Sequence, residues 1–340
     1  PSVSSTTTQP NTSGASIGST NQQVIGIEVV TTGALNALSI TDFTINTNGT
    51  TAPLTDIANA KLWYTGTSAT FATTTQFGST VAAPNGSFNV SGTQTLSEGT
   101  NYFWLTYDVP CGAVLSNVVD AECNSLTVGS PQIPTVQAPA GSRTIIASSA
   151  LSGTVTIGAA GTYPSITGVG GLFAAINTLG VSGNLTANII DATVTETGAT
   201  ALNAVNYFCG GPFTITIKPN TTATLTGTVG TGAIIKLNGA DNVTIDGSNS
   251  GGTDRSLTIQ NTTTATSGNA VIWLASPAIG NGANNNTIKN CIIEGNSATT
   301  SFTGVHIGGS TTIGITTAGT ELNNNNTINN NLFRKTQYGA

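Results

Sequence analysis

The sequence predicts an all-β protein, with an antiparallel β-sandwich in residues 1–147 and a right-handed parallel β-helix in residues 151–340. Composition is the first reason. Charged residues make up 6% of the chain and hydrophobic residues 38%, whereas disordered chains combine low hydrophobicity with high charge. The abundant threonine suits strands, and asparagine and glycine suit tight turns. The other reasons are short alternating segments in the first half and an internal repeat in the second.

Charge and hydropathy exclude several classes of partner. The net charge of −6 disfavours nucleic acid and anionic membranes, because both attract basic surfaces. No apolar run approaches the roughly 18 residues that a transmembrane helix needs. The sequence opens at Pro1 without a signal segment and stops at Ala340 just after a strand-like stretch. We therefore expect a mature chain or a fragment of a longer protein. The C-terminal end favours a fragment, with the β-helix truncated there.

Strand signals recur at short spacing through the first half, each bounded by glycine, asparagine or proline. The predicted strands cover residues 23–32, 38–46, 60–64, 87–90, 101–109 and 118–128. The segment at 101–109 alternates clearly, since Phe103, Leu105 and Tyr107 share one face. Several short antiparallel strands in about 140 residues are typical of a β-sandwich.

Two cysteines of this half flank a predicted hairpin. Cys111 and Cys123 could form a disulfide that closes a small loop, with a stabilisation of about 3 kcal/mol. Such a bond requires an oxidising compartment, which fits an extracellular location.

The first half also resembles a known bacterial domain. The similarity is carried by the segments STNQQVIGIEVVTTGALNALSITDFTINTNGTT, ANAKLWYTG, TQTLSEGTNYFWLTYDVP and GSRTI. Together they resemble the small β-sandwich at the N-terminus of some BNR-repeat sialidase proteins, which also occurs in giant secreted surface proteins of the Bacteroidota. The catalytic sialidase family carries Asp-box repeats of the type S-x-D-x-G-x-x-W, and the chain contains none. The resemblance therefore implies an accessory domain and does not imply sialidase activity.

A short helix is predicted at the start of the second half. Residues 171–179 place Leu172, Phe173, Ile176 and Leu179 at helical spacing, and Gly180 provides a stop. The apolar end of a solenoid has to be covered. We expect this helix to cap the β-helix just before its first coil.

An internal repeat defines the rest of the second half. The stretches TITIKP, NVTIDG, NNTIKN and NNTINN align on Ile217, Ile245, Ile288 and Ile328, with steps of 28, 43 and 40 residues. Each period contains three short strand signals, which predicts one coil of a three-sheet β-helix. A propeller blade has a similar period but would use four antiparallel strands with hairpin signals.

The repeat alignment makes specific predictions about neighbouring side chains. Equivalent residues on successive coils lie about 4.8 Å apart, so the four isoleucines form an inward ladder. The next positions are Lys218, Asp246, Lys289 and Asn329. We expect them on an outward row, with Asp246 between two lysines. Glu294 is expected beside Arg334, and each exposed pair contributes roughly 0–1 kcal/mol.

The second half has its own resemblance. The segments LFAAINTLGVSGNLTANIID, TITIKPN and NGADNVTIDGSNSGG resemble β-helix parts of Bacteroidota surface adhesins exported by the type IX secretion system. This resemblance implies a cell-surface or secreted protein that passes through the outer-membrane secretion machinery.

Candidate residues for chemistry are few. Asp241, Asp246 and Asp254 could form a paired-carboxylate glycosidase site, although aspartate at these corners more simply serves turns. Exposed tryptophans at positions 63, 104 and 273 (Trp63, Trp104 and Trp273) could stack on sugar rings, or fill the cores. His306, the single histidine, has no second ligand or nucleophile beside it, so a structural or surface role is expected. No metal-binding or cofactor motif is found.

These observations favour a non-catalytic portion of a large extracellular adhesin. Its solenoid would present a surface for glycans, other surface proteins, a cell or a substratum. A carbohydrate-active enzyme, or the substrate-binding portion of one, is the first alternative. A subunit of an extracellular filament or sheath is the second.

Overall fold

The computed structural model describes residues 2–33, 36–314 and 322–340 and confirms the predicted all-β fold. The chain divides into two compact units, Pro1–Ser149 and Ala150–Ala340, and each unit is considered by itself. No helix in the described ranges is long and apolar enough to cross a membrane.

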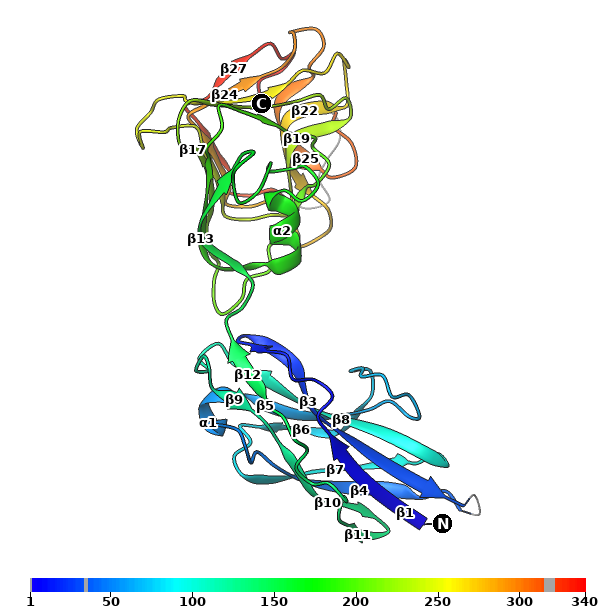
Figure 1. Ribbon diagram of the computed structural model, residues 1–340. Coiled ribbons are helices and arrows are strands. Elements are labelled where there is room, and N and C mark those ends of the chain that lie inside the picture. The colour runs from blue at the N-terminus through cyan, green and yellow to red at the C-terminus, as the bar shows by residue number, and fades with distance from the viewer. Residues whose placement is uncertain (1, 34–35, 315–321) are drawn as a thin grey trace. The chain divides into compact units, whose positions relative to one another are not determined.

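The first unit is an antiparallel β-sandwich (Figure 1). Its described residues form one sheet in the order β1 (Ser2–Thr8), β3 (Ser19–Thr32), β8 (Gly99–Val109), β5 (Asn59–Tyr64) and β6 (Gln76–Ala82). The facing sheet has the order β11 (Ser130–Gln132), β10 (Glu122–Val128), β4 (Ser39–Asn46) and β7 (Ser87–Thr95). A small sheet joins β2 (Ala15–Ser16), β12 (Arg143–Ile146) and β9 (Val118–Val119), and the short helix α1 (Pro53–Asp56) follows β4.

The sandwich core lies between the two large sheets. Phe43 of β4 contacts Phe77 of β6 and Phe103 of β8, with ring centroids 5.3 and 4.9 Å apart. All three rings are buried, and burial of one such side chain contributes roughly 1.5–3 kcal/mol. Because the rings come from both sheets, their contact holds the two layers together.

The strand predictions for this unit were incomplete, and they did not include β6 or β11. The segment 118–128 forms two strands, because β9 pairs with β12 whereas β10 pairs with β4. Strand β1 was missed altogether. Its sequence, SVSSTTT, is dominated by serine and threonine and therefore carries almost no apolar alternation, yet it pairs with β3 along its whole length.

The predicted Cys111–Cys123 disulfide is wrong. Cys123 is a free thiol on β10 that is fully buried in the sandwich core, and burial raises its pKa to about 12. Cys111 lies on the exposed turn after β8 and is disulfide-bonded, but not to Cys123. The two cysteines are close in sequence, but one side chain is exposed and the other is buried in the core, so closeness in sequence does not predict a bond between them.

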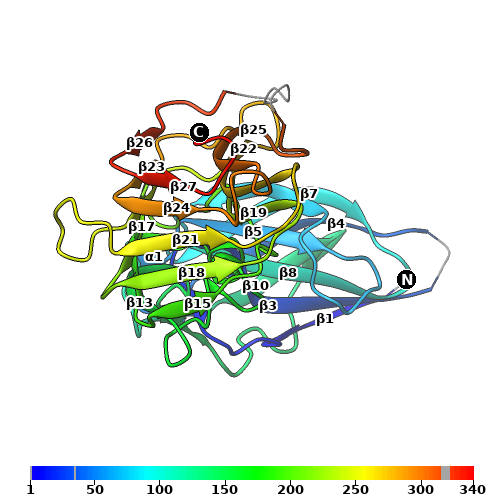
Figure 2. The same ribbon diagram turned by 90° about the horizontal axis from the view of Figure 1, so that it is seen from above.

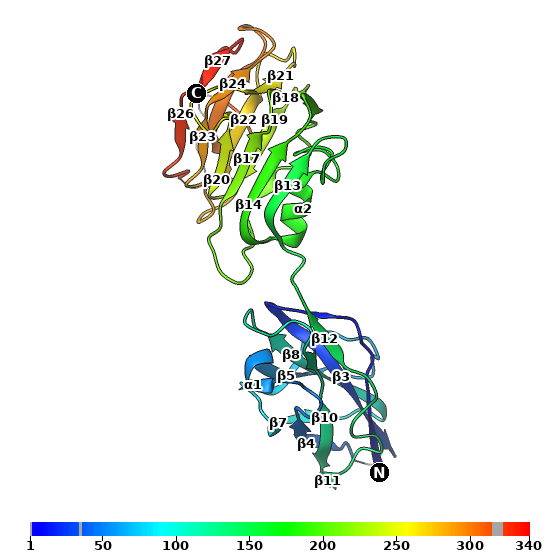
Figure 3. The ribbon, with the colours of Figure 1, turned by 60° about the vertical axis from the view of Figure 1, so that its left-hand side comes forward.

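The second unit is a parallel β-solenoid, as predicted, and its described strands form three sheets. The first sheet, seen in Figure 3, runs β13 (Leu151–Ile157), β14 (Val181–Ile189), β17 (Ile215–Pro219), β20 (Val243–Asp246), β23 (Thr287–Lys289) and β26 (Thr327–Asn329). The second, whose strands stack side by side in Figure 2, runs β15 (Thr193–Thr195), β18 (Ala223–Gly227), β21 (Leu257–Asn261), β24 (Cys291–Glu294) and β27 (Leu332–Arg334). The third runs β16 (Leu202–Asn203), β19 (Gly232–Asn238), β22 (Asn269–Ser276) and β25 (Thr303–Gly309).

The inward row of the first sheet sets the register of the coils. Ile217 pairs with Ile245, Ile245 with Ile288, and Ile288 with Ile328. The same row continues toward the N-terminus through Ala187, which pairs with Ile217. The sequence repeat does not extend to this earlier coil, because alanine replaces isoleucine there and the TIxx pattern is absent.

Asparagine residues turn the chain at the ends of the first-sheet strands. Asn285 and Asn325 adopt φ of 56°, and Asn290 and Asn330 adopt φ of 58° and 50°. This left-handed region is open to asparagine at lower cost than to most residues. The Asn330 side-chain amide donates to Oδ1 of Asn290 at 2.7 Å, so one corner forms an amide ladder along the stack.

The helix α2 (Leu172–Leu179) occupies a different place from the one predicted. It follows β13, so it lies within the first turn of the solenoid and not before it (Figure 1). Leu172, Phe173 and Ile176 are buried in the core that the inward strand residues form. The chain leaves the helix at Gly180 with φ of 71°, where a Cβ would lie 2.6 Å from the carbonyl oxygen of Asn206.

Candidate functional site

The aspartates of the first sheet are engaged in local bonds. Asp246 forms an ion pair with Lys289 at 3.1 Å and accepts from the Asn290 side-chain amide at 2.8 Å. The preceding strand does not extend this pair, because the pairing of β17 with β20 ends at Ile217 and Ile245. In the described residues no ion pair joins Lys218 to Asp246, so the predicted three-residue stack is reduced to one ion pair.

Asp254 is held by its own loop. It accepts hydrogen bonds from the hydroxyls of Ser248 at 2.5 Å and Ser256 at 2.7 Å, and also from Ser250. These bonds hold the pKa of Asp254 well below its usual range. Burial alone would raise the pKa of Asp246, but bonds from Asn290, from the Ser248 amide and from Lys289 outweigh it and lower the pKa.

Asp241 differs from Asp246 and Asp254 because its pKa is raised, not lowered. Its Oδ1 accepts from the backbone amide of Asn284 at 2.6 Å, which links one coil to the next. Burial raises its pKa, against the effect of the Asn284 hydrogen bonds. This carboxylate therefore stabilises the corner between two coils, in agreement with the expected role of aspartate in turns.

Glu294 of the second sheet is buried, contrary to the expectation of an exposed pair. It is 3% exposed and accepts from Nε of Arg334 at 2.6 Å and from Nζ of Lys335 at 2.7 Å. Burial alone would raise its pKa, but Lys335 and Arg334 hold it below the usual range. Strand pairing places Glu294 opposite Arg334, so register brings these two residues together.

The three candidate tryptophans are buried, not exposed. Trp63, Trp104 and Trp273 are 9%, 5% and 4% exposed. The indole Nε1 atoms of Trp63 and Trp104 donate to the hydroxyls of Thr106 and Thr65, each at 2.8 Å. These two indole rings are therefore part of the packed structure of the sandwich unit. Trp273 differs, because its Nε1 has no partner among the described residues.

Trp273 belongs to an outward row on the third sheet of the solenoid. It pairs with Lys236 on β19 and with His306 on β25. Nζ of Lys236 lies 3.9 Å from the indole centroid and donates to the Ser310 carbonyl oxygen at 2.8 Å. The rings of Trp273 and His306 are 6.0 Å apart, edge to face. Burial lowers the pKa of both Lys236 and His306.

A cavity of about 530 Å³ lies over this row. Lys236 and Trp273 line it together with the segment after β25, which includes Ser310 and Ile313. The hydroxyls of its described lining come from Thr231, Ser267, Ser310, Thr311 and Thr312, and no carboxylate is among those lining residues. Ile313 is buried in a small apolar cluster with Trp273 outside the main core, so the segment after β25 packs on the outer face of the third sheet.

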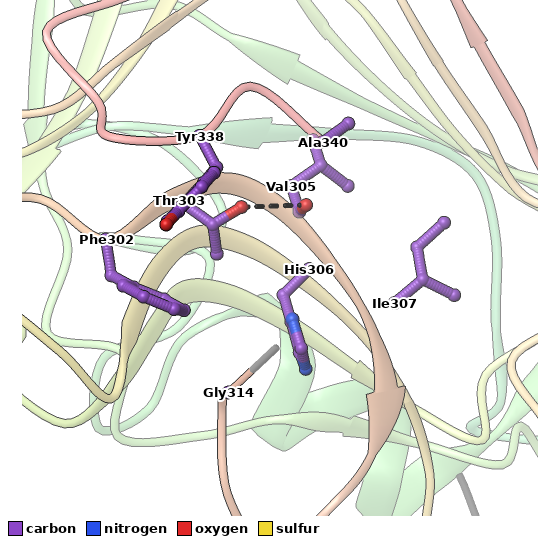
Figure 4. Close-up of a pocket in the computed structure, with 8 residues that line it drawn as sticks. All are labelled: Phe302, Thr303, Val305, His306, Ile307, Gly314, Tyr338 and Ala340. Atoms are coloured by element: carbon purple, nitrogen blue, oxygen red, sulfur yellow. Dashed lines mark hydrogen bonds between the residues drawn. The ribbon is translucent and has the colours of Figure 1, made fainter. Parts of the chain in front are cut away.

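A second cavity of about 330 Å³ adjoins His306 on the same sheet (Figure 4). Phe302 and Tyr338 contribute rings whose centroids are 5.4 Å apart, and Thr303 donates to the Val305 carbonyl oxygen at 3.0 Å. Nε2 of His306 is buried and has no partner among the described residues. No group of three or more His, Cys, Asp or Glu side chains in the described ranges could hold a metal.

One pattern in the sequence does indicate this site, although it lies outside the repeat. Strand β22 reads NAVIWLAS and is buried at every position. A continuous apolar run is typical of a strand covered on both faces. That pattern predicts a cover over the outer face of the third sheet, although it does not identify the covering segment.

Comparisons with known proteins bear on the first unit. Residues 9–131 match the family described as the N-terminal domain of BNR-repeat neuraminidase, which confirms the resemblance seen in the sequence. The comparison with curated proteins finds no match. Among solved structures, Hadza microbial sialidase Hz136 is similar at 14% identity and a TM-score of 0.33. That similarity covers 41% of this chain and 30% of the sialidase chain. The sialidase-associated domain indicates a carbohydrate-related protein.

Proposed function

We propose that this chain is a non-catalytic structural and binding portion of a large extracellular surface adhesin, whose solenoid presents a surface for glycans. The cavity on the third sheet carries the proposal. Its described lining combines one lysine, one indole and several hydroxyls, and concave sites with a few convergent polar groups are typical ligand sites. The sialidase-associated domain supports carbohydrate as the ligand class.

The carboxylates support a binding role over glycoside hydrolysis. A glycosidase pair needs one carboxyl group that stays protonated as the general acid, and this requires a raised pKa. Local hydrogen bonds lower the pKa of both Asp246 and Asp254, so both are ionised at neutral pH. Asp241 has a raised pKa but accepts from the backbone amide of the next coil.

An extracellular location follows from the same proposal. The glycan surface would act outside the cell, with glycans or other surface proteins as partners. The resemblance of the solenoid repeats to Bacteroidota adhesins supports export by the type IX secretion machinery of the outer membrane.

The test is a binding and turnover screen of the whole chain against neutral and acidic polysaccharides. We expect retention on at least one polysaccharide without any release of shorter products. Product release that Asp246→Ala abolishes would instead identify a carbohydrate-active enzyme. Regular filaments in negative-stain images of the purified protein would favour a sheath subunit.

A further inference from the structure

We propose that the cavity over the third sheet binds a carboxylated sugar unit through Lys236. This inference rests on the proposed function, because it specifies the glycan that the same surface takes. It concerns the cavity lined by Lys236, Trp273 and the segment Ser310–Ile313. The evidence comes from the state of the lysine, the state of the indole and the charge of the lining.

Lys236 is a partly buried cation that has no counter-ion among the described residues. Its Nζ lies over the Trp273 ring and donates one hydrogen bond, to the Ser310 carbonyl oxygen. In the described part of the chain no acidic side chain forms an ion pair with it. An ammonium group has three donors, and Ser310 and the Trp273 face engage part of this capacity, so a donor remains for a ligand. A carboxylate bound there would supply the missing opposite charge, which offsets the cost of desolvating the lysine.

Trp273 supplies a second, independent observation. The side chain is 4% exposed and lines the cavity, and its Nε1 donor has no partner among the described residues. Buried polar groups without a partner are rare in native structures. Because this atom is enclosed by protein, the indole contributes its ring to the lining, and the polar contacts to a ligand come from Lys236 and the hydroxyls.

The remaining lining determines the kind of anion. Hydroxyls from Thr231, Ser267 and Thr311 can bond with sugar hydroxyls. A single lysine matches one carboxylate per sugar unit better than a phosphate group, which proteins usually hold with several donors or a helix N-terminus. Lys236 already covers one face of the Trp273 ring, so a sugar cannot stack on that face. The sugar is instead recognised through hydrogen bonds and charge.

The experiment measures binding of the whole chain by calorimetry. The probes are two tetrasaccharides, one that contains galacturonic acid and one that contains glucuronic acid. Each is compared with its carboxyl-reduced counterpart. The variants are Lys236→Met, which keeps most of the apolar stem, and Lys218→Met as a matched control on the first sheet. Thermal unfolding of each variant checks the fold.

We expect an acidic probe to bind at least about tenfold more tightly than its reduced form, since a charge-assisted bond contributes about that factor. Lys236→Met should remove this preference, and Lys218→Met should keep it. Equal affinity for acidic and reduced probes would overturn the inference while leaving the proposed glycan role intact. If Lys236→Met does not fold, the comparison of acidic and reduced probes on the unaltered protein still tests whether the site prefers a carboxylate. Absence of binding to all probes and to every polysaccharide in the screen would count against both proposals.

Discussion

Replacing Arg143 by alanine should destabilise the sandwich unit strongly. This arginine on β12 is 4% exposed. Its guanidinium donates to the backbone carbonyl oxygens of Ser13, Gly14 and Gln23, each at 2.8 Å, and to Oε1 of Gln22 at 2.9 Å. The side chain therefore ties the last strand of the unit to segments more than a hundred residues earlier.

The expected magnitude follows from the acceptors left behind. A buried acceptor that loses its donor costs about 1–3 kcal/mol. Relaxation and entering water reduce the sum, so we expect Arg143→Ala to lower the free energy of unfolding by about 4 kcal/mol. For a unit of this size that corresponds to a fall in Tm of about 8–16 °C. Arg143→Lys should lose about half as much, because an ammonium group cannot span the four oxygens as the planar fork does.

Thermal unfolding followed by hydrogen exchange checks this prediction on the whole chain. Amides of β2, β3 and β12 should lose protection in Arg143→Ala, while those of the solenoid strands should keep it. Arg255→Ala is the matched control, because Arg255 is exposed and bonds only to Asn330 in the described residues; we expect a change below about 1 kcal/mol. A loss below 1 kcal/mol in Arg143→Ala would show that water replaces the guanidinium, and the reasoning would be refuted.

Three further predictions concern the cores and the ion pairs. Ile245→Ala should lower the free energy of unfolding by about 2–5 kcal/mol, because the side chain is fully buried in the isoleucine row. Thr244→Ala on the outward face should change this free energy little. Similar losses in both variants, measured by chemical denaturation, would refute the inward ladder. Glu294 has a lowered pKa in the folded protein, so its stabilisation is present above the unfolded pKa of about 4.3 and is lost as the pH falls further. Between pH 5 and 3 the Tm of Glu294→Gln should therefore fall less than that of the unaltered protein. Cys123, whose burial raises its pKa to about 12, should resist iodoacetamide at pH 8 until the chain is unfolded, as mass spectrometry of peptides would show.

The solenoid was predictable because each coil repeats the same local requirement. An inward apolar residue between two polar ones, and an asparagine that accepts positive φ, recur at Ile245, Ile288 and Ile328. The earliest coils escaped detection, since Ala187 occupies the isoleucine row there. In the sandwich, alternation located the central strands but not the Ser/Thr-rich β1, whose position depends on pairing with β3.

By itself the sequence determined the fold class, the order of the two units and the register of the late coils, because periodic patterns encode strand direction and stacking. Only the tertiary structure decided what lies over the third sheet. The bond from Lys236 to Ser310 spans 74 positions in the chain, and the packing of Ile313 near Trp273 depends on the path of one segment after β25. The same holds for the buried state of Glu294 and the free thiol of Cys123. Such contacts depend on the three-dimensional path of particular segments, and no local period in the sequence records them.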